Sequence, residues 1–256
     1  APMPNPMTTN IVPLELCDMV TEDDMMEEFD LTSYEDYIRN GDTNLIFTYH
    51  LSEEEAWNDE NAIPNPEAYF TGSTTIYIRI ANQPNADQSC TTVVELGVQV
   101  NPLPTVAQNY YAICNENSTG FEAFDLNGFT PTLLGPTQNP DDFLVEYYLT
   151  LADAQNQTNP INQGIPYENT TQGSQTIYVH IYNEITECER VAALTLYAEE
   201  AAVASVVQDI RLCDYDGTND GILELNLNEH WQDDVLGGQD PMQFAVTYHF
   251  TEEDAH

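Results

Sequence analysis

Five cysteines are the residues of this 256-residue chain whose spacing says most about their chemistry. Cys17, Cys114 and Cys213 follow one another at steps of 97 and 99 residues, and Cys90 and Cys188 follow the first two by 73 and 74 residues. Cysteines in such regular pairs are typical of disulfides made in an oxidising compartment. The spacing predicts the bridges Cys17–Cys90 and Cys114–Cys188, and it leaves Cys213 to pair with a cysteine beyond residue 256.

Free thiols and metal binding are the alternatives to disulfides. The cysteines could be buried free thiols of a cytosolic protein, although chance would not preserve both spacings. They could also bind a metal, but the chain has no C-x-x-C motif and no histidine next to a cysteine in sequence. The disulfide interpretation fits the pattern better than either.

An acidic loop directly follows the third of the regularly spaced cysteines. Asp214, Asp216 and Asp220 lie two and four residues apart, with two glycines between and after them. Carboxylate oxygens are the ligands that Ca²⁺ prefers, and glycines allow the tight turns that wrap a loop around an ion. Leu225 stands where the EF-hand motif has its bidentate Glu, so this is not an EF-hand. The loop predicts a weak calcium site, with an ordinary polar turn as the alternative.

The corresponding loops earlier in the chain are less regular. The first contains Asp18, Glu22, Asp23 and Asp24, which makes it a weaker candidate for calcium. The second contains only Asn115, Glu116 and Asn117. We therefore do not expect every loop to bind a metal ion.

Two further side-chain types could in principle form a site. His50 and His249 occupy equivalent places, but the middle repeat has Tyr148 there, so we expect an exposed strand position and not a ligand or a base. Tyr77 and Tyr178 recur on the predicted outward face of one strand, where an aromatic row could stack on sugar rings or pack against a neighbouring loop.

Known catalytic motifs are missing from the sequence. It contains no G-x-S-x-G, H-E-x-x-H, P-loop or G-x-G-x-x-G pattern. Acidic pairs are frequent, but in a chain with 44 Asp and Glu they do not distinguish a catalytic site from an ordinary acidic surface. We expect that the chain is not an enzyme.

The charge balance excludes several partners. Against 44 acidic residues there are four Arg and no Lys, and the formal net charge is -40 at pH 7. Nucleic acids and anionic membrane surfaces would repel such a chain, whereas salt or divalent cations would relieve its self-repulsion. No stretch is apolar enough to insert into a bilayer, and the first residues are not a signal peptide, so we expect any export signal to lie outside this sequence.

The elements that position these residues repeat with the cysteines. Apolar residues alternate with period two around residues 45–51, 76–80 and 96–100 and in their counterparts about 98 residues on, as in half-buried antiparallel strands. The sequence predicts an all-β protein of tandem immunoglobulin-like β-sandwich repeats. The repeats span 1–101, 102–200 and 201–256, and the third lacks counterparts of the late strands.

Two local signals complete the repeat. A hydroxyl residue followed three positions later by an acid, at Ser52, Thr150 and Thr251, predicts the start of a short helix. The segment Asn101–Pro104 carries two prolines, which favour an extended, semi-rigid connector. Together with the charge, this connector predicts an extended array of repeats.

The order of these motifs resembles a known family. The motifs are L-C-D-x-D-G-x-x-D-G (212–221), F-D-L (124–126), D-P-x-x-F-x-V-x-Y-H (240–249), Q-T-I-Y-V-x-I (175–181) and N-P-L-P (101–104). In sequence and spacing they are similar to the tandem repeats of very large secreted surface proteins of gliding Bacteroidetes, of which SprB-like gliding adhesins are the best-known kind.

That resemblance implies export through the type 9 secretion system to the cell surface, and a role in adhesion and gliding motility. The implied partners are the substratum or a surface polysaccharide, and, through regions outside this chain, the outer-membrane secretion and motility machinery. The alternative is a spacer or carbohydrate-binding array in a secreted polysaccharide-degrading enzyme.

Overall fold

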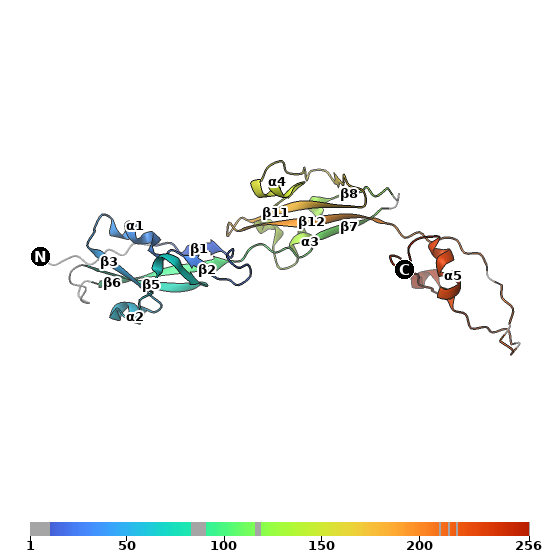
Figure 1. The fold of residues 1–256 in the computed structure, drawn as a ribbon, viewed down its shortest axis with the longest axis horizontal. Helices are drawn as coiled ribbons and strands as arrows, with labels where there is room; N and C mark the ends of the chain where they lie inside the picture. The colour runs from blue at the N-terminus through green and yellow to red at the C-terminus, as the bar shows by residue number, and fades with distance from the viewer. Residues whose placement is uncertain are drawn as a thin grey trace. The chain divides into compact units, whose positions relative to one another are not determined.

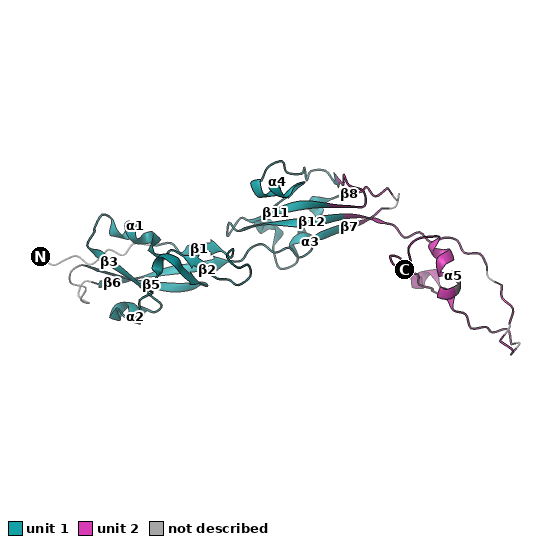
Figure 2. Ribbon diagram, viewed as in Figure 1, with its two compact units in different colours: residues 1–111, 124–167, 176–196 teal, residues 112–123, 168–175, 197–256 magenta. Residues whose placement is uncertain are grey.

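The computed structural model describes residues 11–82, 91–115, 119–209, 211–214, 216–218 and 220–255. Two compact units divide the chain (Figure 2): residues 1–111, 124–167 and 176–196 form one, and residues 112–123, 168–175 and 197–256 form the other. Over the part that is described, no helix has both the length and the apolar character needed to cross a bilayer.

The first repeat is built on a four-stranded sheet in the order β1-β6-β5-β3 (Figure 1). Its strands are β1 (Leu14–Cys17), β3 (Leu45–His50), β5 (Thr74–Asn82) and β6 (Thr91–Asn101). A two-stranded ribbon of β2 (Glu27–Phe29) and β4 (Tyr69–Thr71) accompanies it. β1 runs parallel to β6, whereas β5 pairs antiparallel with both β3 and β6.

The alternating residues predicted from the sequence form the core of this repeat. Ile76, Ile78 and Ile80 of β5 are fully buried, and Leu96 and its period-two partners of β6 pack with them. Burial of such branched side chains contributes about 1.5–3 kcal/mol each, which is why the period of two fixes the register of the sheet.

The second repeat has the same strand order, β7-β12-β11-β9, with a ribbon of β8 and β10. These strands are β7 (Tyr110–Asn115), β8 (Ala123–Phe124), β9 (Phe143–Tyr148), β10 (Tyr167–Glu168), β11 (Ser174–Asn183) and β12 (Glu189–Glu200). The chain is thus an all-β protein of tandem β-sandwich repeats, as predicted. The described residues from 201 onward contain helices α5 (Leu227–Leu236) and α6 (Glu252–Ala255) but no strand.

The F-D-L motif is a helix start, which the strand pattern did not predict. The side chains of Asp30, Asp125 and Asn226 accept hydrogen bonds from backbone N–H groups two or three residues on. Capping satisfies N–H groups that a helix leaves unpaired at its first turn. The caps precede a 3-10 turn (Leu31–Tyr34) with α1 (Glu35–Arg39), helix α3 (Leu126–Leu134) and helix α5.

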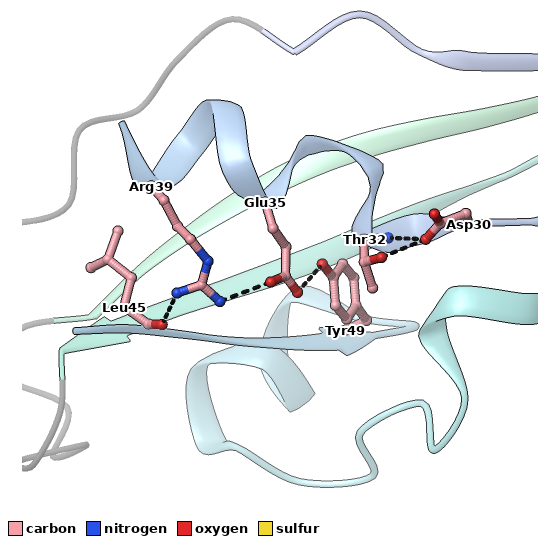
Figure 3. A network of polar contacts seen from close by, with 6 residues as sticks. All are labelled: Asp30, Thr32, Glu35, Arg39, Leu45 and Tyr49. Atoms are coloured by element: carbon pink, nitrogen blue, oxygen red, sulfur yellow. Dashed lines mark hydrogen bonds and ion pairs between the residues drawn. The ribbon is translucent and has the colours of Figure 1, made fainter. Parts of the chain in front are cut away.

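Polar contacts fasten α1 to the edge strand β3 (Figure 3). The Glu35 carboxylate accepts a hydrogen bond from the Tyr49 hydroxyl at 3.0 Å and pairs with the Arg39 guanidinium at 2.8 Å. Arg39 also donates to the Leu45 carbonyl at 2.6 Å and lies over the Phe47 ring. Burial and the neighbouring Glu35 raise the pKa of Tyr49, so this hydroxyl stays a hydrogen-bond donor at any physiological pH.

The predicted short helices are present in all three repeats. They are α2 (Glu53–Asn58), α4 (Leu151–Asn156) and α6, and Ser52, Thr150 and Thr251 cap them as expected. Helix α2 contacts β3, β5 and β6, and Ala56 on it is fully buried, as is its counterpart Ala154 in α4. A helix therefore covers the sheet face that the alternation alone would leave to solvent. Short 3-10 turns at Pro66–Ala68 and Pro140–Asp142 precede β4 and β9.

Because these helices pack on the sheet, two predictions of exposed side chains, one for the histidines and one for the tyrosines, need correction. His50 is fully buried, and its ring nitrogens bond the Glu60 carbonyl at 2.7 Å and the Thr48 hydroxyl at 2.8 Å. Only His249 of the equivalent pair is exposed. Tyr77 and Tyr178 are half-buried, so they do not form an exposed aromatic row.

Buried polar side chains in the middle strands contact the ends of the same helices. Arg79 of β5 is buried and lies 3.6 Å from the carboxylate of Asp59, the left-handed residue that ends α2. His180 of β11 lies within 3.4 Å of the side chain of Gln157, which ends α4, and 2.9 Å from Glu189. Two different residues thus perform one structural task.

The close contact at Ala56 generates a first prediction. Ala56→Leu adds three carbon atoms where no space exists, so it should lower the free energy of unfolding of the first repeat by about 1–3 kcal/mol. Urea unfolding followed by the fluorescence of Trp57, which lies in α2, measures it. Ala255→Leu is the matched control, because the equivalent Ala255 is exposed in this chain. Equal stability of both variants would contradict the packing of α2 on the sheet.

Candidate functional site: the inter-repeat disulfide and the acidic loops

A disulfide joins Cys17 to Cys188, 171 residues further along the chain, with their Cα atoms 5.6 Å apart. Cys17 is the last residue of β1 in the first repeat, and Cys188 precedes β12 in the second repeat. The predicted bridges Cys17–Cys90 and Cys114–Cys188 are therefore wrong. The crosslink is made between repeats and not within one.

The geometry of β6 explains the correction. Cys17 is paired with Asn101, the last residue of β6, whereas Thr91 begins that strand at its hairpin with β5. Cys90 lies outside the described residues, but it directly precedes Thr91 in the sequence. Eleven residues of strand span about 33 Å, and a disulfide needs its Cα atoms within about 7 Å. An intact β6 thus keeps Cys17 away from the hairpin end of its own repeat.

The other two cysteines in the described residues are free and exposed. Cys114 is the counterpart of Cys17 in the second repeat, and Cys213 is the counterpart in the third. Cys213 was expected to have no partner within this sequence, whereas Cys114 was expected to bond Cys188.

Non-covalent contacts surround the bridge. Cys188 is fully buried, and its Sγ lies 4.0 Å from the carbonyl oxygen of Asn101, which also accepts a hydrogen bond from the Asp18 N–H at 2.9 Å. Glu22, four residues beyond Asp18, forms an ion pair with Arg190 of β12 at 2.9 Å. The acidic loop of the first repeat therefore contacts the second repeat directly beside the disulfide.

The predicted calcium ligands of the third repeat do lie together. One carboxylate oxygen from each of Asp214, Asp216 and Asp220 lies within 4.8 Å of the others. Asp214 is half-buried and its Oδ1 has no hydrogen-bond partner, while its Oδ2 accepts from the N–H of Gly221 at 2.8 Å. Hydrogen bonds from Thr218 lower the pKa of Asp216, which keeps its carboxylate ionised. Such a set of oxygens suits a hard divalent cation.

A disulfide between consecutive β-sandwich repeats defines a class of tandem-repeat protein that matures in an oxidising, extracellular setting. The chain belongs to the family described as the Flavobacterium inter-domain disulphide bond domain, whose model matches residues 13–104 and 109–202. The two matched segments coincide with the two repeats that the bridge connects.

Comparisons beyond the family add little. No curated protein matches the chain. Among solved structures, human mucin-like protocadherin EC1-2 is 12% identical (62% of this chain, 85% of that one, TM-score 0.23), and Drosophila N-cadherin EC1-3 is 10% identical (64% and 58%, TM-score 0.24). The Bacteroides ovatus protein SGBP-B, in complex with a mixed-linkage heptasaccharide, is 12% identical (80% and 48%, TM-score 0.20). At such TM-scores these likenesses support no argument about function.

The bridge generates a second prediction. Digestion of the unreduced protein with an acid-specific protease should release a peptide pair that contains Cys17 and Cys188. Cys188→Ser should lower the free energy of unfolding by about 2–5 kcal/mol, because the bridge restricts the unfolded chain over 171 residues. Cys114→Ser, which removes a free thiol, is the control and should leave stability unchanged. Recovery of a Cys17–Cys90 peptide pair would refute this connectivity.

The acidic loop generates a third prediction. Titration calorimetry with CaCl₂ should detect weak binding at the third repeat, in the range of about 10⁻⁴–10⁻³ M that extracellular modules use. Asp216→Ala should remove that binding event, since it deletes one of three clustered carboxylates. Asp209→Ala, an exposed acid outside the loop, is the control. If both variants bind calcium like the parent, the loop is a polar turn only.

Proposed function

We propose that this chain is part of the stalk of a large secreted cell-surface adhesin, and that its repeats carry tension. The disulfide between Cys17 and Cys188 is the observation on which the proposal rests. The family supports the coarser statement that these are extracellular repeats. Adhesion, gliding motility and export by the type 9 secretion system are the finer part of the proposal.

The bridge determines which part of the chain carries a pulling force. When the chain is pulled from both sides, tension that reaches Cys17 crosses to Cys188 through the S–S bond. The residues between them, which include β3, β5 and β6 of the first repeat and β9 and β11 of the second, are bypassed. These strands are therefore protected from extension as long as the bond is intact, whereas β1 and β12 lie outside the bridged segment and stay in the path of the force.

The same connectivity can be extended along an array. The first cysteine of one repeat bonds the second cysteine of the next, so Cys114 would bond the second cysteine of a complete third repeat, and Cys213 that of a fourth. Both thiols are exposed and free in this chain, as this arrangement requires. Successive bridges would overlap, so that each stretch of the array is bypassed by at least one of them.

Charge supports a stalk more than a compact assembly. Repulsion among the 44 acidic side chains disfavours folding of an array back onto itself, and it disfavours contact with nucleic acids or anionic membranes. In this proposal the substratum or a surface polysaccharide is held by other parts of the protein, and the chain itself performs no catalysis.

The alternative, a spacer array in a secreted polysaccharide-degrading enzyme, would use the same repeats. The half-buried state of Tyr77 and Tyr178 offers no aromatic platform for sugar in its favour. Sequencing the gene on both sides of this segment distinguishes the two: many further repeats support the adhesin, and a catalytic domain supports the enzyme.

The tension-bearing role generates a fourth prediction. In single-molecule pulling between the two ends of the chain, reduction should add about 600 Å of contour length, because 171 residues become extensible at roughly 3.5 Å each. Before reduction this length should stay hidden at any force below rupture of the S–S bond. The measurement is the total contour length with and without dithiothreitol.

Cys114→Ser is the matched control for that experiment, because it leaves the Cys17–Cys188 bridge intact. It should show the same hidden length as the parent chain, whereas Cys188→Ser should show the full length without reductant. A parent chain that extends fully under oxidising conditions would rule out the load-bypassing role.

A further inference from the structure

The loop that follows Cys17 contains a buried carboxylate, Asp18, in which only one of the two oxygens has a hydrogen-bond partner. Asp18 is 1% exposed, and its Oδ2 accepts a hydrogen bond across the loop from the N–H of Met25 at 3.2 Å. Its other oxygen, Oδ1, is buried and has no hydrogen-bond partner. A buried carboxylate oxygen that has neither a hydrogen-bond donor nor a cation beside it costs several kcal/mol of folding free energy. We therefore expect Asp18 Oδ1 to have a bound partner that is not part of the chain.

The loops that follow the first cysteine of each repeat can be aligned with one another, because each contains a residue with positive φ at an equivalent position. Met25, Gly120 and Gly221 all have positive φ, at 56°, 74° and 77°. Each lies four residues before the apolar residue that opens the F-D-L motif or its counterpart. In the first and third loops the N–H of this residue bonds the carboxylate that follows the cysteine, at Asp18 and Asp214.

The second repeat shows what occupies the equivalent position when the carboxylate is replaced by an amide. Asn115, the counterpart of Asp18, is 1% exposed. Its Nδ2 lies 3.0 Å from the Phe121 carbonyl, 3.0 Å from the Glu122 carboxylate and 3.2 Å from the Thr119 hydroxyl. A group with two N–H donors thus lies at the centre of three oxygens.

The first repeat has Asp18 in place of Asn115, so it lacks the amide donor, but it keeps an acid at the position of Glu122. Glu27 is the counterpart of Glu122 and is itself only 6% exposed, with its Oε1 accepting hydrogen bonds from the N–H groups of Met19 and Val20. An ionised Asp18 can only accept hydrogen bonds, and so can an ionised Glu27. Two buried carboxylates in one loop repel each other unless a positive group lies between or beside them.

We propose that the loop of residues 18–27 in the first repeat binds a divalent cation, with Asp18 Oδ1 as a ligand and the Glu27 carboxylate as its charge partner. Beside Oδ1, the cation supplies the positive charge that the N–H donors of the Asn115 amide supply in the second repeat. Carboxylate and carbonyl oxygens are hard ligands, which suit Ca²⁺ and, with tighter geometry, Mg²⁺. This site is separate from the cluster at Asp214, Asp216 and Asp220 in the third repeat.

Because the proposed site adjoins the disulfide, a bound cation would also affect the contact between the first and second repeats. Asp18 directly follows the bridged Cys17, and Glu22 of the same loop is ion-paired with Arg190 of the second repeat. An ion that orders residues 18–27 therefore also orders one side of this inter-repeat contact. Calcium would stabilise the junction through the loop and not through the disulfide.

The test uses the full chain with Asp216→Ala, so that the third-repeat cluster contributes no calcium binding. Titration calorimetry with CaCl₂ and, separately, MgCl₂ should find about one remaining ion per chain, and scanning calorimetry should show a higher melting temperature with calcium than with EDTA. Adding Asp18→Asn should abolish both effects. The same variant should melt in EDTA at least as high as its parent, because an amide supplies the donors that Asn115 supplies.

The reciprocal variant keeps the proposal falsifiable if Asp18→Asn disturbs folding. Asn115→Asp should lower the melting temperature of the second repeat in EDTA, and calcium should restore it. Calcium binding that persists unchanged in Asp18→Asn would overturn the proposal. It would equally be overturned if Asp18 were held neutral by a proton, which would appear as stability that falls with rising pH and does not respond to either cation.

Discussion

The length of the central strand is the constraint on which this architecture depends. β6 extends over eleven residues, and Cys17 of β1 is paired with its last residue, Asn101, whereas its first residue, Thr91, begins the hairpin with β5. Because a strand of that length holds its ends about 33 Å apart, Cys17 lies too far from the hairpin end of β6 for a disulfide to reach it. Cys17 instead bonds Cys188, which directly precedes β12 of the second repeat. The strand thus turns two cysteines per repeat into a connection between repeats.

The sequence predicted the strands well and the crosslink wrongly, for one physical reason. Alternation at Ile76, Ile78 and Ile80 reports burial on one face of a strand, which is local. The pairing of cysteines is not local, and a periodic sequence is unchanged by a shift of one repeat, so spacings of 73 and 74 residues fit bonds within repeats and between them equally. Only the strand length, together with the parallel pairing of β1 with β6, decides between them.

Side chains on the outer face of the sheet were misjudged because a short helix covers them. The caps at Ser52 and Thr150 predicted where α2 and α4 begin, but a helix of six residues has too little pattern to show which surface it covers. Contact of α2 with the sheet buries His50 and Arg79, and the two residues that directly follow this helix, Asp59 and Glu60, supply polar partners for them. The clustering of Asp214, Asp216 and Asp220 was predictable, because ligands two and four residues apart within one loop are brought together by the turn itself.

The loops after the cysteines show how repeats of one fold can differ in chemistry while they share one backbone feature. A residue with positive φ ends each loop, and a buried Asp or Asn side chain at the loop's start bonds backbone within it, although the second loop is two residues shorter. Because of this difference in length, Glu27 and Glu122 lie at different distances in sequence from Cys17 and Cys114, so counting from the cysteine does not align them. Exchanging one atom group, an amide for a carboxylate, converts a loop that satisfies itself into one with an unpaired buried oxygen. If the first loop binds a cation as proposed, this position is where junctions joined by the same type of disulfide would differ in their response to ions.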